Sequence, residues 1–517
     1  MPLHGFSDCL PVLVPQQEVL QPFIPTVVGN VEYREWKKTL ERMDEILRLG
    51  RVEESFLRLS LARRNEREVV LAAKESRPTH TLTTAEQEGF QLLSARALRC
   101  NLVRTLTGEG FRPFGRRLAE SPLLQWFCRL GRLDRVRIPG KSQLQRYAEW
   151  LPEADMRKVV DTLLSAATNP IDSDGRQRIA LQESLDLEAY FLDTTCVKLN
   201  MHFPVDWVLL RDAARTLLKA TRLIRKRGLK VRMEEPETFL KQMNRLCIEM
   251  THSRRKKDAK RQRKATLRRM KKLSKVIARH AEQHRDALAQ RWRETELSEG
   301  QAKQILERID IILERLPQAI RQAHERIIGE RQVLNEEKIL SLYEGHAAVY
   351  VRGKAGAEVE FGSQLLLGEN ESGLIVDWEL VLGNPKADTK LLGRSLERLV
   401  KSSCGEQPGA VGGDRGFDSK PNRHLLEQAK TFNAICPKSP AELRRRMKEE
   451  RFVELQKRRS QTEARIAIFK HGFLGSPLLS KGHGRQEIQV AWAVLTHNLW
   501  LTARLPRQEK RALRKAN

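Results

Sequence analysis

The sequence predicts an α/β fold in which one sheet is interrupted by a large, basic helical insertion and preceded by a helical N-terminal region. An aromatic and apolar run with β-branched residues at 190–199 is typical of a buried strand. Strand and turn patterns return only after residue 336, and the residues between carry apolar side chains at helical spacing. A chain of 517 residues is also long enough for more than one domain.

The N-terminal region is predicted to begin with an extended arm, because residues 1–30 are rich in proline and lack periodicity. Apolar residues then recur at helical spacing up to Gly50, which would stop the helix: Trp36, Leu40, Met43, Ile46 and Leu47. We therefore expect an arm and helices over 1–84, and a second helical region over 85–185.

A helix-turn-helix over residues 137–167 is one interpretation of the second region. Ser142 is suited to an N-cap, and Pro152 would end the first helix. The exposed polar residues available to read DNA would be Gln145, Arg146 and Arg157. Small helical bundles have the same pattern of helix ends, so both interpretations stay open.

The insertion over 202–336 contains the most basic stretch of the chain. Between Arg254 and Arg279, 14 of 26 residues are Lys or Arg, and Asp258 is the only acid. Such a run is often just a solvated helix face, but its one-sided charge favours contact with a phosphate backbone. The candidate contacts are Arg254, Arg255, Lys256, Lys257, Arg268 and Arg269. An apolar stripe from Ile305 to Ile327 predicts a helical hairpin, with Pro317 as a kink or a new helix start and with a dimer contact as one role.

The remaining strands and helices follow after residue 336. Residues 346–384 are predicted to form strands joined by turns, which would complete the sheet begun at 190–199. Asp414 ends a further short strand, and residues 440–472 are predicted to form one helix. An apolar helix up to 505 precedes a basic tail at 506–517.

Three acidic residues in different settings suggest one metal site. Asp193 lies on the predicted buried strand, where an unpaired carboxylate is costly, and Asp414 enters a turn at a strand end. Glu463 shares a helix face with Arg459 and Lys470. Each acid also has a structural explanation, namely a turn cap, an Asx turn and an ion pair with Arg459.

The order of the three acids and the 48 residues between Asp414 and Glu463 favour a shared site over three separate structural roles. Asp377, Asp388 and Asp418 are weaker candidates.

These segments resemble the DDE transposases of bacterial insertion sequences, and most closely their ISNCY-like group. The family signature Tyr-x2-Arg-x3-Glu-x6-Lys is met by Arg459, Glu463 and Lys470, with Gln456 at the Tyr position. The second-aspartate motif is matched at Asp414, Gly416, Phe417 and Ser419, and the first at Asp193 and Thr195. The resemblance covers residues 186–201 and about 340–505, roughly a third of the chain.

The resemblance implies an RNase H-like catalytic domain formed by 186–201 and 337–505. It also implies metal-dependent hydrolysis at the ends of an insertion sequence, followed by transfer of the freed 3′-OH into target DNA. Two Mg²⁺ ions, with Mn²⁺ as a substitute, would be held by Asp193 as a shared ligand, Asp414 on one ion and Glu463 on the other. Arg459, Lys470, Lys354 and Arg415 would contact DNA.

Composition is consistent with a polyanionic partner. The chain has 94 Lys and Arg against 66 Asp and Glu, a formal net charge of +28. No long apolar run and no charged leader is evident, so we expect no membrane association. The 7 cysteines are scattered and without zinc spacing, as in reducing cytoplasm.

We therefore expect a cytoplasmic, nucleoid-associated bacterial protein that binds double-stranded DNA, both element ends and target, as a homo-oligomer in a synaptic complex. Two alternatives stay open. One is a metal nuclease or resolvase that cuts without joining, and the other is a basic nucleic-acid-binding protein without enzymatic activity.

Overall fold

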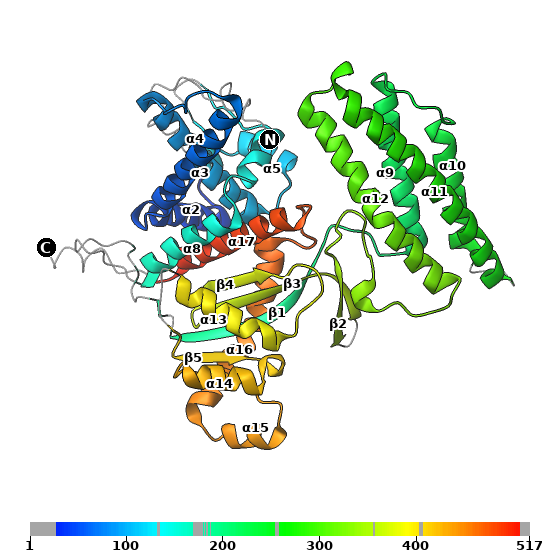
Figure 1. Cartoon of the computed structure of the whole chain (residues 1–517). Coiled ribbons are helices and arrows are strands. Elements are labelled where there is room, and N and C mark those ends of the chain that lie inside the picture. The colour runs from blue at the N-terminus through cyan, green and yellow to red at the C-terminus, as the bar shows by residue number, and fades with distance from the viewer. Residues whose placement is uncertain are drawn as a thin grey trace, which may run out of the picture. The chain divides into compact units, whose positions relative to one another are not determined.

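The computed structural model describes residues 27–131, 135–168, 179, 181, 185–186, 188–253, 258–354, 357–402 and 407–506, with the side chains of 352–358 excluded. The predicted arm up to residue 26, the tail from 507, and the four candidates at 254–257 lie outside this part. The chain divides into two compact units (Figure 1). We call Lys198–Ser363 with Leu382–Pro385 the insertion unit and the other described residues the sheet unit. The protein is mixed α/β and mostly helical, which confirms the predicted class in its coarse form.

The N-terminal helices of the sheet unit are α2 (Val31–Leu49), α3 (Val52–Glu75), α4 (Thr84–Thr107), α5 (Phe111–Glu120) and α6 (Pro122–Phe127). The stripe predicted on α2 is confirmed, since Leu40, Met43, Ile46 and Leu47 are buried and Gly50 caps the helix. Helix α4 begins with a capping box formed by Thr83 and Glu86.

Helices α7 (Lys141–Ala148) and α8 (Glu153–Thr168) occupy the segment interpreted as a helix-turn-helix. The N-cap of α7 is Gly140 rather than Ser142. Arg157, predicted to be exposed, instead donates to Asp377 at 3.1 Å and stacks on Trp378 with its guanidinium 4.0 Å from the ring. The expectation that Arg157 is exposed is wrong, because its guanidinium pairs with the carboxylate of Asp377, which is distant in sequence.

The sheet of this unit is formed by β1 (Ala189–Lys198), β3 (Ala357–Asn370), β4 (Ile375–Leu380), β5 (Ala410–Gly413) and β6 (Phe432–Ile435). Strand β3 belongs to this unit from Gln364 onward. The strand order is β4-β3-β1-β5-β6. β4 is antiparallel to β3, whereas β5 is parallel to both β1 and β6. The predicted strands at 190–199, within 346–384 and before Asp414 are confirmed.

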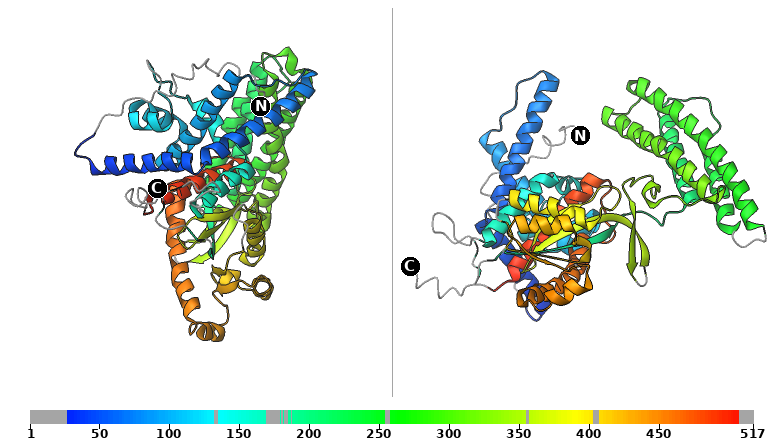
Figure 2. Two further views of the ribbon diagram at one scale, coloured as in Figure 1. Left: turned by 90° about the vertical axis from the view of Figure 1, so that its left-hand side faces the viewer. Right: turned by 60° about the horizontal axis from the view of Figure 1, so that its bottom comes forward.

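Helices cover both faces of this sheet: α13 (Leu391–Lys401), α14 (Lys420–Gln428), α15 (Pro440–Arg446), α16 (Glu450–Phe469) and α17 (His483–Arg504). The Tyr190 hydroxyl hydrogen-bonds to Ser395 of α13 at 2.6 Å, while Arg458 of α16 lies 4.8 Å from the ring of the next residue, Phe191. Because neighbouring side chains of a strand point to opposite faces, α13 and α16 lie on opposite sides of β1 (Figures 1 and 2).

The single helix predicted over 440–472 is wrong. Helix α15 ends at Arg446, α16 starts at Glu450, and the chain passes at Lys470 into a short π-helix, Lys470–Leu474. Arg446 explains the first break, because its guanidinium donates to the Asn433 carbonyl at 2.7 Å and pairs with Glu449.

The insertion unit is a bundle of α9 (Asp206–Lys226), α10 (Pro236–His252), α11 (Ala259–Arg291) and α12 (Glu299–Ile327), with β2 (Ala348–Lys354) antiparallel to the first part of β3 (Figure 1). Short 3-10 turns lie at Trp292–Glu294 and Asn335–Glu337. Pro317 lies inside α12, so it does not start a new helix. The stripe from Ile305 on α12 is buried in the bundle's own core, so a dimer contact is not needed to cover it. Among the described residues, no helix is long and apolar enough to cross a membrane.

Candidate active site

Asp193 lies on the central strand β1, on the side that faces α16. Phe191 and Thr195 bracket it on that side, because Arg458 packs on Phe191 and the Lys470 ammonium donates to the Thr195 hydroxyl at 3.1 Å. The Thr194 amide donates to the Asp193 carboxylate at 2.7 Å. The carboxylate is thus oriented by its own backbone and lies under α16.

Asp414 follows the neighbouring parallel strand β5. Leu192 and Gly413 are partners in the register between β1 and β5, so the two aspartates occupy the next position on each strand. The Gly416 amide donates to Asp414 at 2.8 Å in the tight turn Arg415–Phe417. The structure therefore brings together the two aspartates that the sequence nominated.

The electrostatics of this pair appear in the pKa of Asp193. Burial, and after it the negative charge of Asp414, raise that pKa to about 6, although the Thr194 amide and Arg459 act in the opposite direction. Asp388 also raises it. A carboxylate with a repelling neighbour in partial burial is a setting in which a cation is favourable.

Asp388 is a third acid at this place, ranked as a weak candidate from the sequence. It begins the 3-10 turn Asp388–Lys390 and accepts from the Thr194 hydroxyl at 3.0 Å and from Gln364 at 3.3 Å. Its carboxylate is so close to Gly416 that a Cβ there would lie 2.5 Å from it. Burial and then Asp414 raise the pKa of Asp388. Its loop has no local motif, so only its position after β4 could have indicated it.

The other two weak candidates are structural. Asp418 pairs with Arg423 at 2.7 Å and accepts from the Lys438 amide, which together hold its pKa below the usual range. Asp377 is buried between Arg398 and Arg157. None of these contacts involves Asp193 or Asp414.

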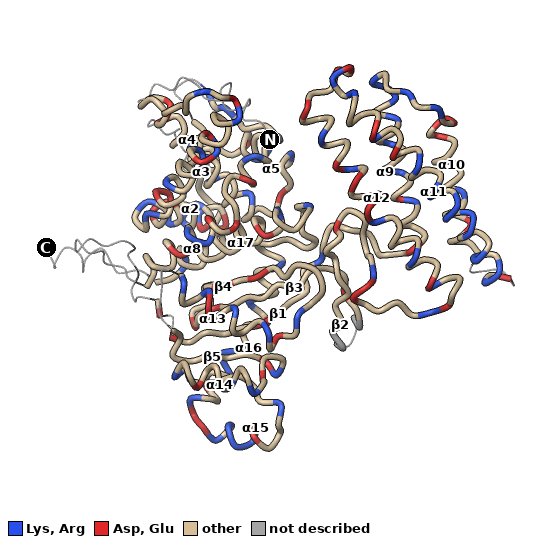
Figure 3. Tube along the Cα trace, viewed as in Figure 1, with Lys and Arg blue, Asp and Glu red and all other residues tan. Residues whose placement is uncertain are grey.

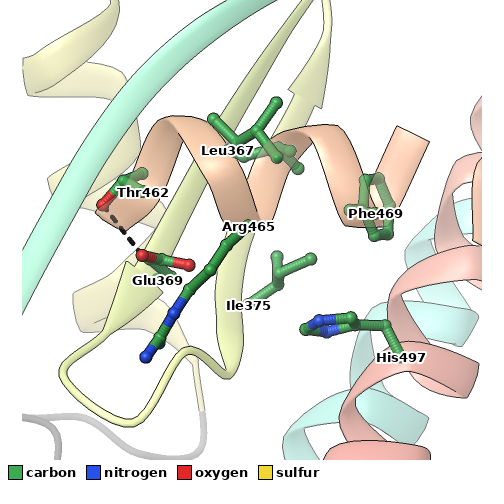
Figure 4. Close-up of a pocket in the computed structure, with 8 residues that line it drawn as sticks. Leu367, Glu369, Ile375, Thr462, Arg465, Phe469 and His497 are labelled. Atoms are coloured by element: carbon green, nitrogen blue, oxygen red, sulfur yellow. Dashed lines mark hydrogen bonds between the residues drawn. The ribbon is translucent and has the colours of Figure 1, made fainter. Parts of the chain in front are cut away.

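Helix α16 is fixed to the sheet by its buried side. The Thr462 hydroxyl donates to Glu369 of β3 at 2.8 Å, and Arg458 pairs with the same carboxylate at 3.0 Å. Figure 4 shows the small pocket beneath this side, where Thr462 and Phe469 of α16 face Glu369 and His497. The pocket is lined by packing residues and contains neither Asp193 nor Asp414.

Glu463 lies on the exposed part of α16. In sequence it comes between Arg458, which covers Phe191, and Lys470, which donates to Thr195. The three acids nevertheless do not close into one ligand group: in the part of the chain that the structure describes, no three His, Cys, Asp or Glu side chains are placed to hold a metal. The nomination of Glu463 as a ligand stays a prediction.

The predicted DNA contacts differ in their surroundings. The Arg459 Nε donates to the Gln456 side-chain oxygen at 3.3 Å, and the Gln456 amide nitrogen donates to the Ala434 carbonyl. Lys470 donates to the Cys196 carbonyl at 2.8 Å as well as to Thr195. Arg415 is exposed beside Asp414. Lys354 is the last residue of β2, and its side chain is not described.

Gln456 has a clear structural role. It ties β6 to Arg459, and Arg459 in turn lowers the pKa of Asp193.

The donor set at the aspartate pair fits a hard divalent cation. Carboxylate oxygens are the ligands that Mg²⁺ prefers, and after burial the charge of Asp414 is the second cause that raises the pKa of Asp193. A metal there would be held by Asp193 and Asp414, with Glu463 as the third expected ligand.

Comparison of the chain with protein-family models, with curated proteins and with solved structures finds no match.

Proposed function

We propose that this protein is a DDE-type DNA transposase with an RNase H-like catalytic domain. The observation that carries the proposal is the pair Asp193 and Asp414 on adjacent parallel strands, close enough for one to raise the pKa of the other. The same two residues match the first two acidic motifs of the family.

The strand order supports the proposal at the level of the fold. In the order β4-β3-β1-β5-β6, the strands β1, β3 and β4 form one half of the sheet. Strand β5 lies parallel beside β1, and β6 lies parallel beside β5. An RNase H-like sheet has this order, with one acid on the central strand and one after the neighbouring parallel strand. The helix bearing the third acid lies against the same side of β1 as Asp193.

The chemistry asked of the site is phosphodiester attack. Divalent ions held by the carboxylates would activate the attacking oxygen and stabilise the leaving oxygen. Asp193 and Asp414 would bind the divalent ions. Arg459, whose charge acts on Asp193, would neutralise the phosphate that approaches them. Water would attack at the element end first, and the freed 3′-OH would then attack target DNA.

A strand-transfer assay tests the proposal. Duplexes carrying the genomic sequence that flanks the gene are incubated with supercoiled plasmid in Mg²⁺ or Mn²⁺. Joined products should form with the wild type and be lost in Asp193→Asn, Asp414→Asn and Glu463→Gln. Glu454→Gln, which removes an exposed acid from the same helix α16, is the matched control and should keep activity.

Two outcomes would contradict the proposal. Cleavage without joining, lost in the same three variants, would identify a metal nuclease. DNA binding without chemistry in either metal would identify a basic DNA-binding protein.

A further inference from the structure

The cations of α11 divide into two sets with different surroundings. One set lies on the exposed side of the helix at intervals of three, four or seven residues, and so on one face. Its members are Arg261, Arg268, Lys272, Lys275 and Arg279. We call this set the α11 stripe. Within the described part of the chain, none of the five forms an ion pair or a hydrogen bond.

Other cations of α11 have partners inside the insertion unit. Lys260 and Lys264 both pair with Glu330, and Arg269 pairs with Glu249. Lys271 lies 3.0 Å from the ring of His324. Arg269, nominated from the sequence together with Arg268, therefore has an internal partner, whereas Arg268 has an open side chain.

The stripe lies opposite the buried face of its helix. Met270, Ile277 and Ala281 are buried in the core of the bundle. At 100° per residue they project about half a turn away from Arg268 and Lys272. The bundle therefore orients the stripe outward, and Figure 3 shows Lys and Arg recurring along α11. On that side Asp258 precedes Arg261 at the N-cap, and the next acids, Glu282 and Asp286, come after Arg279.

We propose that the α11 stripe is a contact surface for the phosphate backbone of double-stranded DNA, an inference that rests on the proposed function. From Arg261 to Arg279 the stripe spans about 27 Å at 1.5 Å per residue. Duplex DNA presents one phosphate per ~1.7 Å of its axis, so a helix laid along it meets phosphates throughout that length. Flexible Lys and Arg side chains accommodate the remaining differences in spacing.

The surroundings of the stripe favour DNA over an anionic membrane. A helix that lies on a membrane needs large apolar side chains beside its cations. Among the described residues, the exposed large apolar side chains include none on α11. The stripe therefore has charge for a polyanion but no apolar surface to insert into lipid.

The test is the salt dependence of DNA binding by the full-length protein. Fluorescence anisotropy with a labelled 40-base-pair duplex is measured in EDTA between 50 and 200 mM KCl, so that no chemistry occurs. Each phosphate contact contributes about 0.9 to the slope of log K against log salt. Changing all five stripe residues to Gln should lower that slope by about 2 to 4.5 and weaken binding at 100 mM KCl by at least ~50-fold.

A matched variant removes the same charge from the same helix. It changes five α11 cations that have internal partners: Lys260, Lys264, Arg269, Lys271 and Arg285. Its slope should change by less than about 1. Equal losses in the two variants would show that only net charge matters, and an unchanged slope in the stripe variant would remove the surface from DNA binding.

Two further measurements complete the test. Loss of binding to phosphatidylserine vesicles in the stripe variant, with DNA binding unchanged, would overturn the proposal in favour of lipid. The double variant Lys272→Glu with Lys275→Glu, checked for native helicity, guards against unfolding of the larger variant and should also lower the slope. Because EDTA abolishes chemistry in every sample, a failed strand-transfer assay does not affect this result.

Discussion

Asp193→Asn should stabilise the sheet unit while abolishing activity. The substitution removes the charge that burial and Asp414 disfavour, and it keeps the oxygen that accepts from the Thr194 amide. Since the pKa of Asp193 is raised from 3.8 to about 6, ionisation costs the folded state about 3 kcal/mol at pH 8. The variant should be more stable than the wild type by up to that amount.

The pH dependence of the free energy of unfolding tests the sign of this stability difference. Protonated Asp193 contributes stability that is fully present below 3.8, its pKa in the unfolded chain. This stability is lost as pH rises through about 6, its pKa in the folded protein. The advantage of Asp193→Asn should therefore be largest above pH 7 and fall to about half at pH 5.

Urea unfolding followed by tryptophan fluorescence, in EDTA, measures this difference. Asp418→Asn is the control, because its pKa is lowered by Arg423 and its loss should destabilise by about 1–3 kcal/mol. Adding Mg²⁺ at pH 8 should raise the unfolding midpoint of the wild type and not that of Asp193→Asn. An Asp193→Asn protein less stable than the wild type at pH 8 would refute the reasoning.

Three other predictions concern stability. Burial lowers the pKa of His497 to about 4, so stability should fall by about 3 kcal/mol as pH drops from 6.5 to 4, and His497→Gln should flatten that dependence in urea titrations. Gly368→Ala should destabilise by about 1–3 kcal/mol in thermal unfolding, because its Cβ would lie 2.0 Å from the Tyr190 hydroxyl, whereas Gly393→Ala should not. Arg157→Met should lower the free energy of unfolding by about 2 kcal/mol, since a buried carboxylate loses a charged donor; no change would contradict the assigned contact.

The elements that the sequence predicted well are those with local signals. The stripe on α2 ends at a glycine, β1 opens with an aromatic and apolar run, and Asp414 precedes a glycine turn. Each feature is decided by residues within a few positions of one another. The aspartate pair could be nominated for the same reason.

The features that the sequence missed depend on distant partners. Asp388 is placed by the Thr194 hydroxyl and Gln364, and Arg157 by a carboxylate on β4. The break before α16 interrupts a run of strong helix formers, and it is stabilised by Arg446 reaching back to β6. No periodicity in the chain encodes such contacts.

The order of the strands along the chain has a consequence for biosynthesis. β1 is complete at Lys198, yet its neighbours β3 and β5 begin only at Ala357 and Ala410. During translation the apolar residues of β1 therefore have no neighbouring strand to pair with until the four-helix bundle has been synthesised. That bundle has a core of its own and can fold first. Because β1 and β3 are neighbours in the sheet, folding of the bundle between them shortens the length of flexible chain that separates the two strands. The insertion is therefore made after the first strand of the sheet and before both of that strand's neighbours.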